Sequence, residues 1–162
     1  MISTQEIILR LLAAVAFAGV VGLQRYLVGK SAGMRTHILV SLGSALFMLI
    51  CGYAFRTSPT NTDRIAAQIV TGIGFIGGGA ILKERGSIRG LTTAAGLWAA
   101  AALGMAAGAG LYTIGLIGTI MILLTLAVLR LVERRLPRHT WGAWVVEITT
   151  SRRASIGELS VS

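Results

Sequence analysis

The chain has 162 residues, of which 54% are hydrophobic and only 13% are charged, and its formal net charge at neutral pH is +9. This composition excludes an ordinary soluble domain, in which about a quarter of the residues are charged. The basic excess does not indicate nucleic-acid binding, since no aromatic residues interleave with a compact basic patch. We therefore expect an integral membrane protein that is surrounded by a lipid bilayer.

Five nearly uncharged segments follow one another along the chain, at residues 7–23, 38–55, 65–82, 91–107 and 111–129. Each is close to the roughly 20 residues that an α-helix needs to cross a bilayer. Backbone polar groups in lipid must be satisfied within the segment, so we expect helices rather than open strands. The predicted fold class is all-α, a polytopic bundle of five transmembrane helices over residues 1–136.

The basic residues indicate how these helices are oriented. Twelve of the 15 lysines and arginines fall in the first loop, in the third loop or after the fifth helix, and three fall on the opposite side. Positively charged residues are retained on the cytoplasmic side of a membrane. The bias therefore places the N-terminus outside and the C-terminus in the cytoplasm.

The second segment begins with a polar stripe. Five residues share one helical face, namely His37, Ser41, Ser44, Met48 and Cys51. Polar stripes inside a membrane face protein or water rather than lipid. Two interpretations stay open: interhelical hydrogen bonds, worth about 0.6 kcal/mol each on average, or a wetted pathway or ligand cavity.

The third and fourth segments carry comparable stripes and many glycines. The third has Gln68, Thr71, Gly72, Phe75 and Gly79 on one face, and the fourth adds Thr93, Gly96 and Ala100. Close helix packing through small residues is the first interpretation of the glycines, and it assigns this role to Gly72, Gly74, Gly78, Gly104 and Gly108. The alternative is a broken helix at residues 77–79, whose backbone groups meet a ligand.

The inventory of chemically active residues is small. The chain has one cysteine and two histidines, and it has no paired carboxylates and no HExxH or CxxC motif. We therefore expect no enzymatic activity, no metal site and no cofactor. The basic residues of the first and third loops would attract anions to the cytoplasmic mouth of the bundle, unless they serve only to set the topology. They are Arg25, Lys30, Arg35, Lys83, Arg85 and Arg89.

The character of the sequence changes after Pro137. The stretch "WGAWVVEITT" has the aromatic and β-branched residues typical of a strand. About 25 residues are too few to bury a core of their own. We expect residues 137–162 to be a cytoplasmic tail on the bundle or the start of a cytoplasmic domain.

Three long stretches of this chain resemble the bacterial MgtC/SapB family of inner-membrane proteins. They are "GLQRYLVGKSAGMRTHILVSLGSALF", "DRIAAQIVTGIGFIGGGAIL" and "RGLTTAAGLWAAAALGMAAGAGLY", in the same order and spacing. The resemblance implies a location in the bacterial inner membrane and a role in adaptation to low Mg²⁺, in ion or phosphate homeostasis and in virulence. It also implies that residues 137–162 open an ACT-like domain.

The resemblance further implies which positions are functional. Carried over by motif, they are Arg25, Lys30, Gly33, Arg35, Thr36, Asp63, Arg64, Gln68, Gly72, Gly90, Thr92, Thr93 and Trp98. The family usually has Glu where this chain has Gln24, which weakens the case for cation binding there. It also commonly has Ala where this chain has Gly78, and Ser or another small residue at Gly96.

Together these observations predict a homo-oligomeric inner-membrane protein that regulates a membrane-protein partner in ion homeostasis. We expect Gln68, His37, Thr36 and Thr93 to line a cytoplasm-facing cavity with Arg25, Arg35 and Arg89 at its rim. The further candidates for a ligand site or pathway are Gln24, Lys30, Asp63, Arg64, Thr71 and Thr92. The alternative function is a transporter or channel that carries a small ion through this cavity, and a purely structural oligomeric scaffold is the third.

Overall fold

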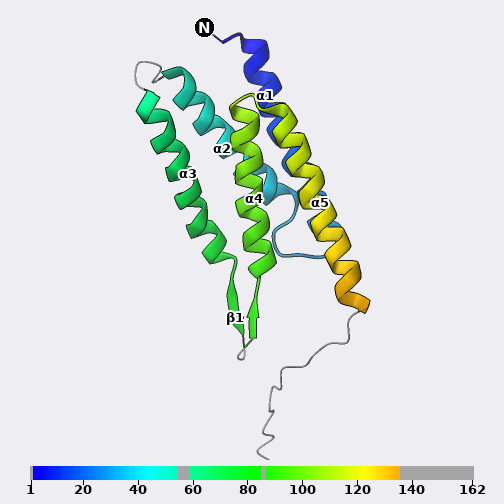
Figure 1. Ribbon diagram of the computed structural model, residues 1–162. Coiled ribbons are helices and arrows are strands. Elements are labelled where there is room, and N and C mark those ends of the chain that lie inside the picture. Colours follow the sequence, from blue (N-terminus) through cyan, green and yellow to red (C-terminus); the bar gives the residue numbers. More distant parts are fainter. Residues whose placement is uncertain (1, 55–58, 85–86, 136–162) are drawn as a thin grey trace, which may run out of the picture.

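The computed structural model describes residues 2–54, 59–84 and 87–135 of the chain (Figure 1). The elements, in chain order, are α1 (Thr4–Leu27), α2 (Met34–Ala54), α3 (Pro59–Gly79), β1 (Leu82–Glu84), β2 (Ser87–Arg89), α4 (Leu91–Gly108) and α5 (Tyr112–Arg135). The predicted helical bundle is confirmed. The predicted tail, residues 137–162, lies outside the described residues.

Four of the described helices are long and apolar enough to cross a membrane. They are α1, residues Met34–Tyr53 of α2, α4, and residues Tyr112–Val132 of α5. The third helix is 21 residues long but is not among them. It has Asp63 and Arg64 near its start and is rich in glycine, both of which lower its hydropathy.

The ends of α1 follow from its local sequence. Ser3 is the N-cap, and its hydroxyl accepts a hydrogen bond of 3.2 Å from the backbone N–H of Glu6. A serine followed three residues later by glutamate is a sequence signature of a helix start. The helix continues through Leu27, and Gly29 then adopts a φ of +70°, a conformation that favours glycine. The first loop therefore begins later than the sequence led us to expect.

A short antiparallel hairpin, which the sequence did not predict, connects α3 to α4. Leu82 pairs with Arg89 and Glu84 with Ser87. Gly90 follows the hairpin at a φ of +93°, and a Cβ atom there would overlap the backbone carbonyl of Ala80. The chain can therefore enter α4 directly from the hairpin only with glycine at this position.

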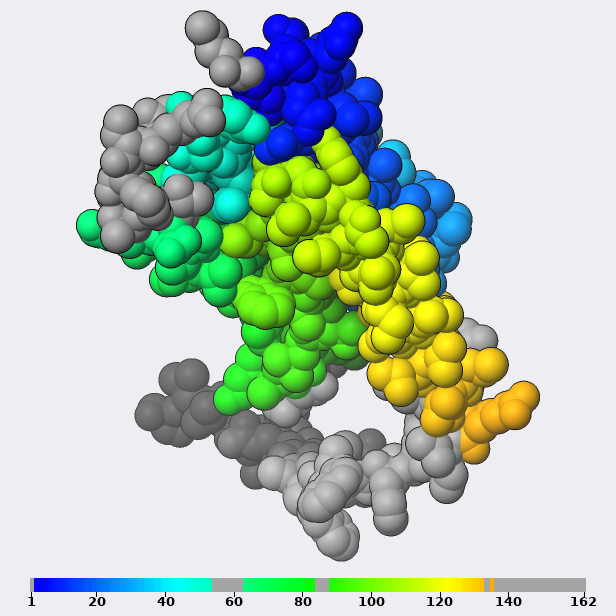
Figure 2. All heavy atoms as spheres, turned by 45° about the horizontal axis from the view of Figure 1, so that its top comes forward, coloured from blue at the N-terminus to red at the C-terminus, as the bar shows by residue number. Residues whose placement is uncertain are grey.

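The fourth helix is the centre of the bundle and contacts each of the other helices, with its largest contact against α2. Figure 2 shows α4 between α3 and α5 on the face in view. Two glycines permit the close approach of α4 to α2. A Cβ atom on Gly104 would overlap the Ser41 carbonyl, and one on Gly108 would lie 2.6 Å from the Ala45 carbonyl oxygen.

The glycines of α3 do not pack in this way. A Cβ atom on Gly72, Gly74 or Gly78 would meet no atom within 4 Å. The packing predicted for these three glycines is therefore not found among the described residues of the chain. On this helix it is Gly77 that contacts α4, where an added Cβ would lie 3.7 Å from the Cβ of Ala94.

Candidate functional site

A buried arginine joins α1 to the start of α4. The side chain of Arg25 is 3% exposed, and its Nη2 donates a hydrogen bond of 3.2 Å to Oγ1 of Thr93. We expected Arg25 in a loop at the rim of a cavity, and that expectation is wrong. Because α1 extends to Leu27, Arg25 lies on a helical face that is covered by its neighbours.

His37 lies in the first turn of α2 and is fully buried. Its Nδ1 is 2.9 Å from the backbone carbonyl oxygen of Gly33. A carbonyl can only accept, so Nδ1 carries the proton and Nε2 of a neutral ring is left as an acceptor. This Nε2 faces α4, where a Cβ atom on Gly96 would lie 3.3 Å from it.

Three buried polar atoms in this region have no hydrogen-bond partner among the described residues. They are Oε1 of Gln24, Nε of Arg25 and Nε2 of His37. A buried polar group without a partner costs about 1–3 kcal/mol. Such groups are uncommon, and each calls for a water, an ion or a function that explains it. Their concentration here distinguishes this end of the bundle from the rest.

The electrostatic surroundings of this site are positive. Arg130 of α5 is close enough to Arg25 to repel it, and Arg25 in turn repels a positive charge on His37. Thr93 and His37 also lie in the first turns of α4 and α2, and the N-terminus of a helix carries a partial positive charge. The arrangement therefore favours an anionic ligand.

The other basic and polar candidates lie nearer the surface. Lys30, Arg35, Arg89 and Thr92 are exposed, and Thr36 is half-buried. Asp63 and Arg64 are exposed near the start of α3, at the end of the bundle opposite the hairpin (Figure 1). The Thr71 hydroxyl donates to the backbone carbonyl of Ala67 within its own helix.

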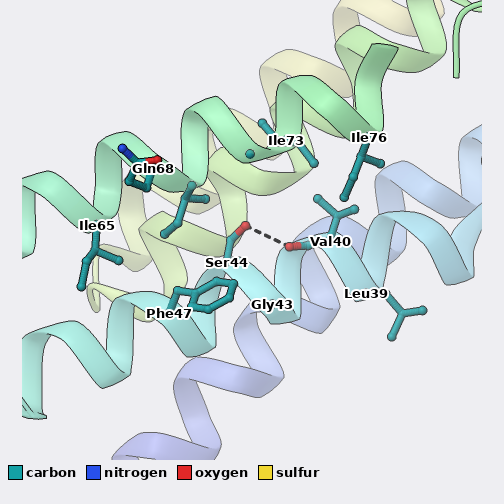
Figure 3. Close-up of a pocket in the computed structure, with 11 residues that line it drawn as sticks. Leu39, Val40, Gly43, Ser44, Phe47, Ile65, Gln68, Ile73 and Ile76 are labelled. Atoms are coloured by element: carbon teal, nitrogen blue, oxygen red, sulfur yellow. Dashed lines mark hydrogen bonds between the residues drawn. The ribbon is translucent and has the colours of Figure 1, made fainter. Parts of the chain in front are cut away.

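Gln68 is separated from the buried site formed by Arg25, His37 and Thr93. It lines a cavity of about 510 Å³ between α2 and α3, together with Ser44 and apolar side chains of both helices (Figure 3). His37, Thr36 and Thr93 are not among the lining residues. The single cavity that we expected is therefore divided into an apolar groove and a buried polar cluster.

The serines of the α2 stripe are satisfied by backbone carbonyls. The Ser41 hydroxyl donates to Ala14 of α1 at 3.0 Å, and the Ser44 hydroxyl donates to Val40 one turn back at 2.9 Å. Cys51 is fully buried on the same face. For Ser41, interhelical hydrogen bonding is thus the better of the two interpretations.

The opposite end of the bundle holds an ionic cluster that the sequence analysis missed. Arg10 donates to Glu6 at 2.8 Å and to the Gly108 carbonyl at 2.9 Å, and the Tyr112 hydroxyl donates to Glu6 at 2.9 Å. The guanidinium also lies over the ring of Tyr53, 5.7 Å from its centroid. Glu6 and Arg10 are one helical turn apart, and this spacing could have predicted their ion pair from the sequence.

Acidic and metal-binding groups do not gather within the described part of the chain. No group of three or more His, Cys, Asp or Glu residues there is placed to hold a metal ion. The buried polar and charged side chains are instead Arg25, His37, Ser41, Ser44, Thr93 and Thr119.

The sequence matches the MgtC family over residues 11–135. It is 46% identical over 139 residues to the "Putative magnesium transporter YhiD" of Escherichia coli K12, covering 82% of this chain and 65% of that protein. It is 43% identical over 129 residues to "Protein MgtC" of Salmonella typhimurium, covering 80% and 54% respectively. The "Uncharacterized protein slr0014" of Synechocystis is 43% identical over 125 residues, covering 77% and 53%.

The chain spans less than two thirds of the length of these curated relatives. The matched part lies within the described helical bundle and ends with it at Arg135. No solved structure matches the chain.

Proposed function

Because this chain belongs to the MgtC family, we propose that it is a bacterial inner-membrane protein of magnesium homeostasis. It acts as a regulator of a membrane-protein partner and not as an enzyme. Two similar proteins carry the names "Putative magnesium transporter YhiD" and "Protein MgtC", which support the link to magnesium. Roles in phosphate homeostasis and in virulence are part of the same proposal.

The buried guanidinium of Arg25 is the observation that favours a regulator over a magnesium conduit. Mg²⁺ binds carboxylate and water oxygens and gives up its water reluctantly. A divalent cation that passed between α1 and α4 would meet Arg25 at 3% exposure, with Arg130 beside it. The buried positive charge of Arg25, in a region of low dielectric, forms a barrier to such an ion.

The proposed membrane arrangement has five spans, with the N-terminus outside and the C-terminus in the cytoplasm. Four of these spans are the long apolar helices described above, and the additional one is α3, whose 21 residues suffice to cross the hydrocarbon. We also propose a homo-oligomer in which the outer face of α3 meets a second copy. Gly74 and Gly78 lie one turn apart on that face, and both are open within the chain.

The regulatory proposal is tested by measuring flux and growth together. The purified chain is reconstituted in liposomes that contain a Mg²⁺ indicator, and the same gene is returned to a strain that lacks it. We expect rescue of growth in low Mg²⁺ without Mg²⁺ entry above that of protein-free liposomes. Saturable entry by folded protein would contradict the regulatory role.

A transporter of a small ion is the second candidate function. The observation that favours it is the cavity between α2 and α3, which places the amide of Gln68 beside an otherwise largely apolar lining (Figure 3). The liposome measurement distinguishes the two, with Gln68→Ala as the variant. A transporter requires flux that Gln68→Ala reduces, and uptake of K⁺ and phosphate is measured in parallel with uptake of Mg²⁺.

A further inference from the structure

Arg25 and Arg130 lie near the ends of two helices, α1 and α5, that pack against each other. Arg25 comes from α1 and is buried, whereas Arg130 comes from α5 and is exposed. The two repel each other. Arg25 donates a hydrogen bond to Thr93, and no salt bridge to a carboxylate is found for Arg25 among the residues whose side chains the structure describes.

The hydrogen-bonding capacity of Arg25 is also incompletely used. Its Nη2 is held by Thr93, but its Nε is buried and has no partner in the described chain. The free Nε–H of an arginine can donate a charge-assisted hydrogen bond to an oxygen of a carboxylate or phosphate. Thr93 fixes the orientation of the guanidinium through Nη2, and Arg130 supplies a second positive charge from the surface.

The position of the two residues along their helices narrows the chemistry of the ligand. Arg25 lies two residues before the end of the apolar span Thr4–Leu27, and Arg130 lies two residues before the end of the span Tyr112–Val132. The end of an apolar span corresponds to the boundary between hydrocarbon and head groups. Basic pockets between helices at this depth bind lipid head groups.

We propose that Arg25 and Arg130 together bind a phosphate group, with Thr93 positioning the guanidinium of Arg25. The phosphate belongs to an anionic phospholipid or to a free phosphate in solution, because both present the same oxygens. In this proposal the anion lies between α1 and α5 and reaches Arg25 past the exposed Arg130. It neutralises the repulsion between the two arginines and thereby stabilises the contact between these helices.

The test uses the full chain, purified in a phosphate-free maltoside detergent. Thermal unfolding and native mass spectrometry are followed as inorganic phosphate, phosphatidylglycerol or diacylglycerol is added, the last being a lipid without phosphate. We expect at least one of the two phosphate compounds to raise the unfolding temperature, and diacylglycerol to leave it unchanged. Stabilisation by phosphatidylglycerol alone identifies a lipid head group, and stabilisation by inorganic phosphate identifies a soluble anion.

Three variants of α5 test the residues without disturbing the buried Arg25. Arg130→Gln is expected to weaken binding about tenfold, as for the loss of one charge-assisted contact. Arg135→Gln removes an exposed arginine five residues further along the same helix and is the matched control. Arg130→Glu is expected to stabilise the ligand-free protein, because the new carboxylate pairs with Arg25, and to abolish the effect of phosphate.

Two results would overturn the proposal. One is that neither inorganic phosphate nor phosphatidylglycerol stabilises the unmodified chain more than diacylglycerol does. The other is that Arg130→Gln and Arg135→Gln weaken binding equally, which would reduce the effect to non-specific attraction by the basic end of the bundle. Binding is measured on the purified chain, so its outcome does not depend on the proposed regulatory role.

Discussion

The guanidinium of Arg10 on α1 donates a hydrogen bond of 2.9 Å to the backbone carbonyl of Gly108, the last residue of α4. The two residues are 98 positions apart in the sequence. The last carbonyls of a helix have no partner within it, so Arg10 satisfies a group that the bundle would otherwise leave exposed to lipid or to the membrane boundary. This contact joins the beginning of the chain to the centre of the fold.

Arg10→Met is expected to destabilise the bundle by about 1.5–3 kcal/mol, the range for a hydrogen bond to a charged group. Methionine keeps much of the apolar stem but cannot donate to Gly108 or pair with Glu6. Thermal unfolding in detergent measures the change. Tyr112→Phe, which removes the hydrogen bond to Glu6 alone, should have a smaller effect. An equal or larger effect would show that the contacts of Arg10 are not the main source of stability in this cluster.

Gly104→Ala is expected to destabilise the chain by at least about 1–3 kcal/mol. The added methyl group overlaps the Ser41 carbonyl and forces α2 and α4 apart. Gly78→Ala is the matched control on α3, where an added Cβ meets no atom within 4 Å. It should leave the monomer unchanged or stabilise it by up to about 1 kcal/mol through helix propensity.

These two variants also test the proposed oligomer. The unfolding temperature reports on packing within the chain, and the oligomer size in detergent reports on contacts between copies. Gly78→Ala should reduce the oligomer without unfolding the monomer. Equal loss of stability in both variants would contradict the packing described for α2 and α4.

Thr93→Val removes the acceptor of Arg25 while keeping the shape of the side chain. A buried donor that loses its partner costs about 1–3 kcal/mol. We therefore expect a lower unfolding temperature, and Thr93→Ser, which retains the hydroxyl, should restore most of it. If valine and serine behave alike, the hydrogen bond of 3.2 Å between Arg25 and Thr93 contributes little to stability.

Gly96→Ser is expected to be better tolerated than Gly96→Ala. A Cβ atom at this position lies 3.3 Å from Nε2 of His37, a tight contact for either side chain. The serine hydroxyl can donate to this nitrogen, which has no partner in the described chain, whereas the alanine methyl only crowds it. Unfolding temperatures of the two variants, each alone and combined with His37→Phe, measure the difference. The advantage of serine should disappear in the phenylalanine background.

The proposed orientation is tested by thiol labelling in intact cells. The chain has one cysteine, Cys51, which is fully buried and gives little background. Ser31→Cys lies in the loop between α1 and α2, and Ala109→Cys lies at the opposite end between α4 and α5, both at exposed positions. A membrane-impermeant maleimide should label only Ala109→Cys. Labelling of Ser31→Cys instead would invert the topology.

Much of the helical bundle could be predicted from the sequence. Apolar runs of about 20 residues predicted the helices because burial in lipid and backbone hydrogen bonding are local properties of each segment. Gly104 and Gly108 are four residues apart, and this spacing of small residues on one helical face indicated close helix packing. The element that the sequence missed, the β1–β2 hairpin, has only three residues in each strand, too short for alternation of polar and apolar residues to be seen.

The sequence by itself determined that the chain is a helical membrane protein, and that one face of α2 carries His37, Ser41 and Ser44. Only the tertiary structure decided what meets that face. Helical periodicity places residues on a common side but does not specify the rotation of one helix against another. The packing of the helices brings Arg25 to Thr93 across 68 positions and places Gln68 beside Ser44 rather than His37. The polar residues were therefore predictable as a set, whereas their division into a buried arginine site and a separate groove depended on packing between distant segments.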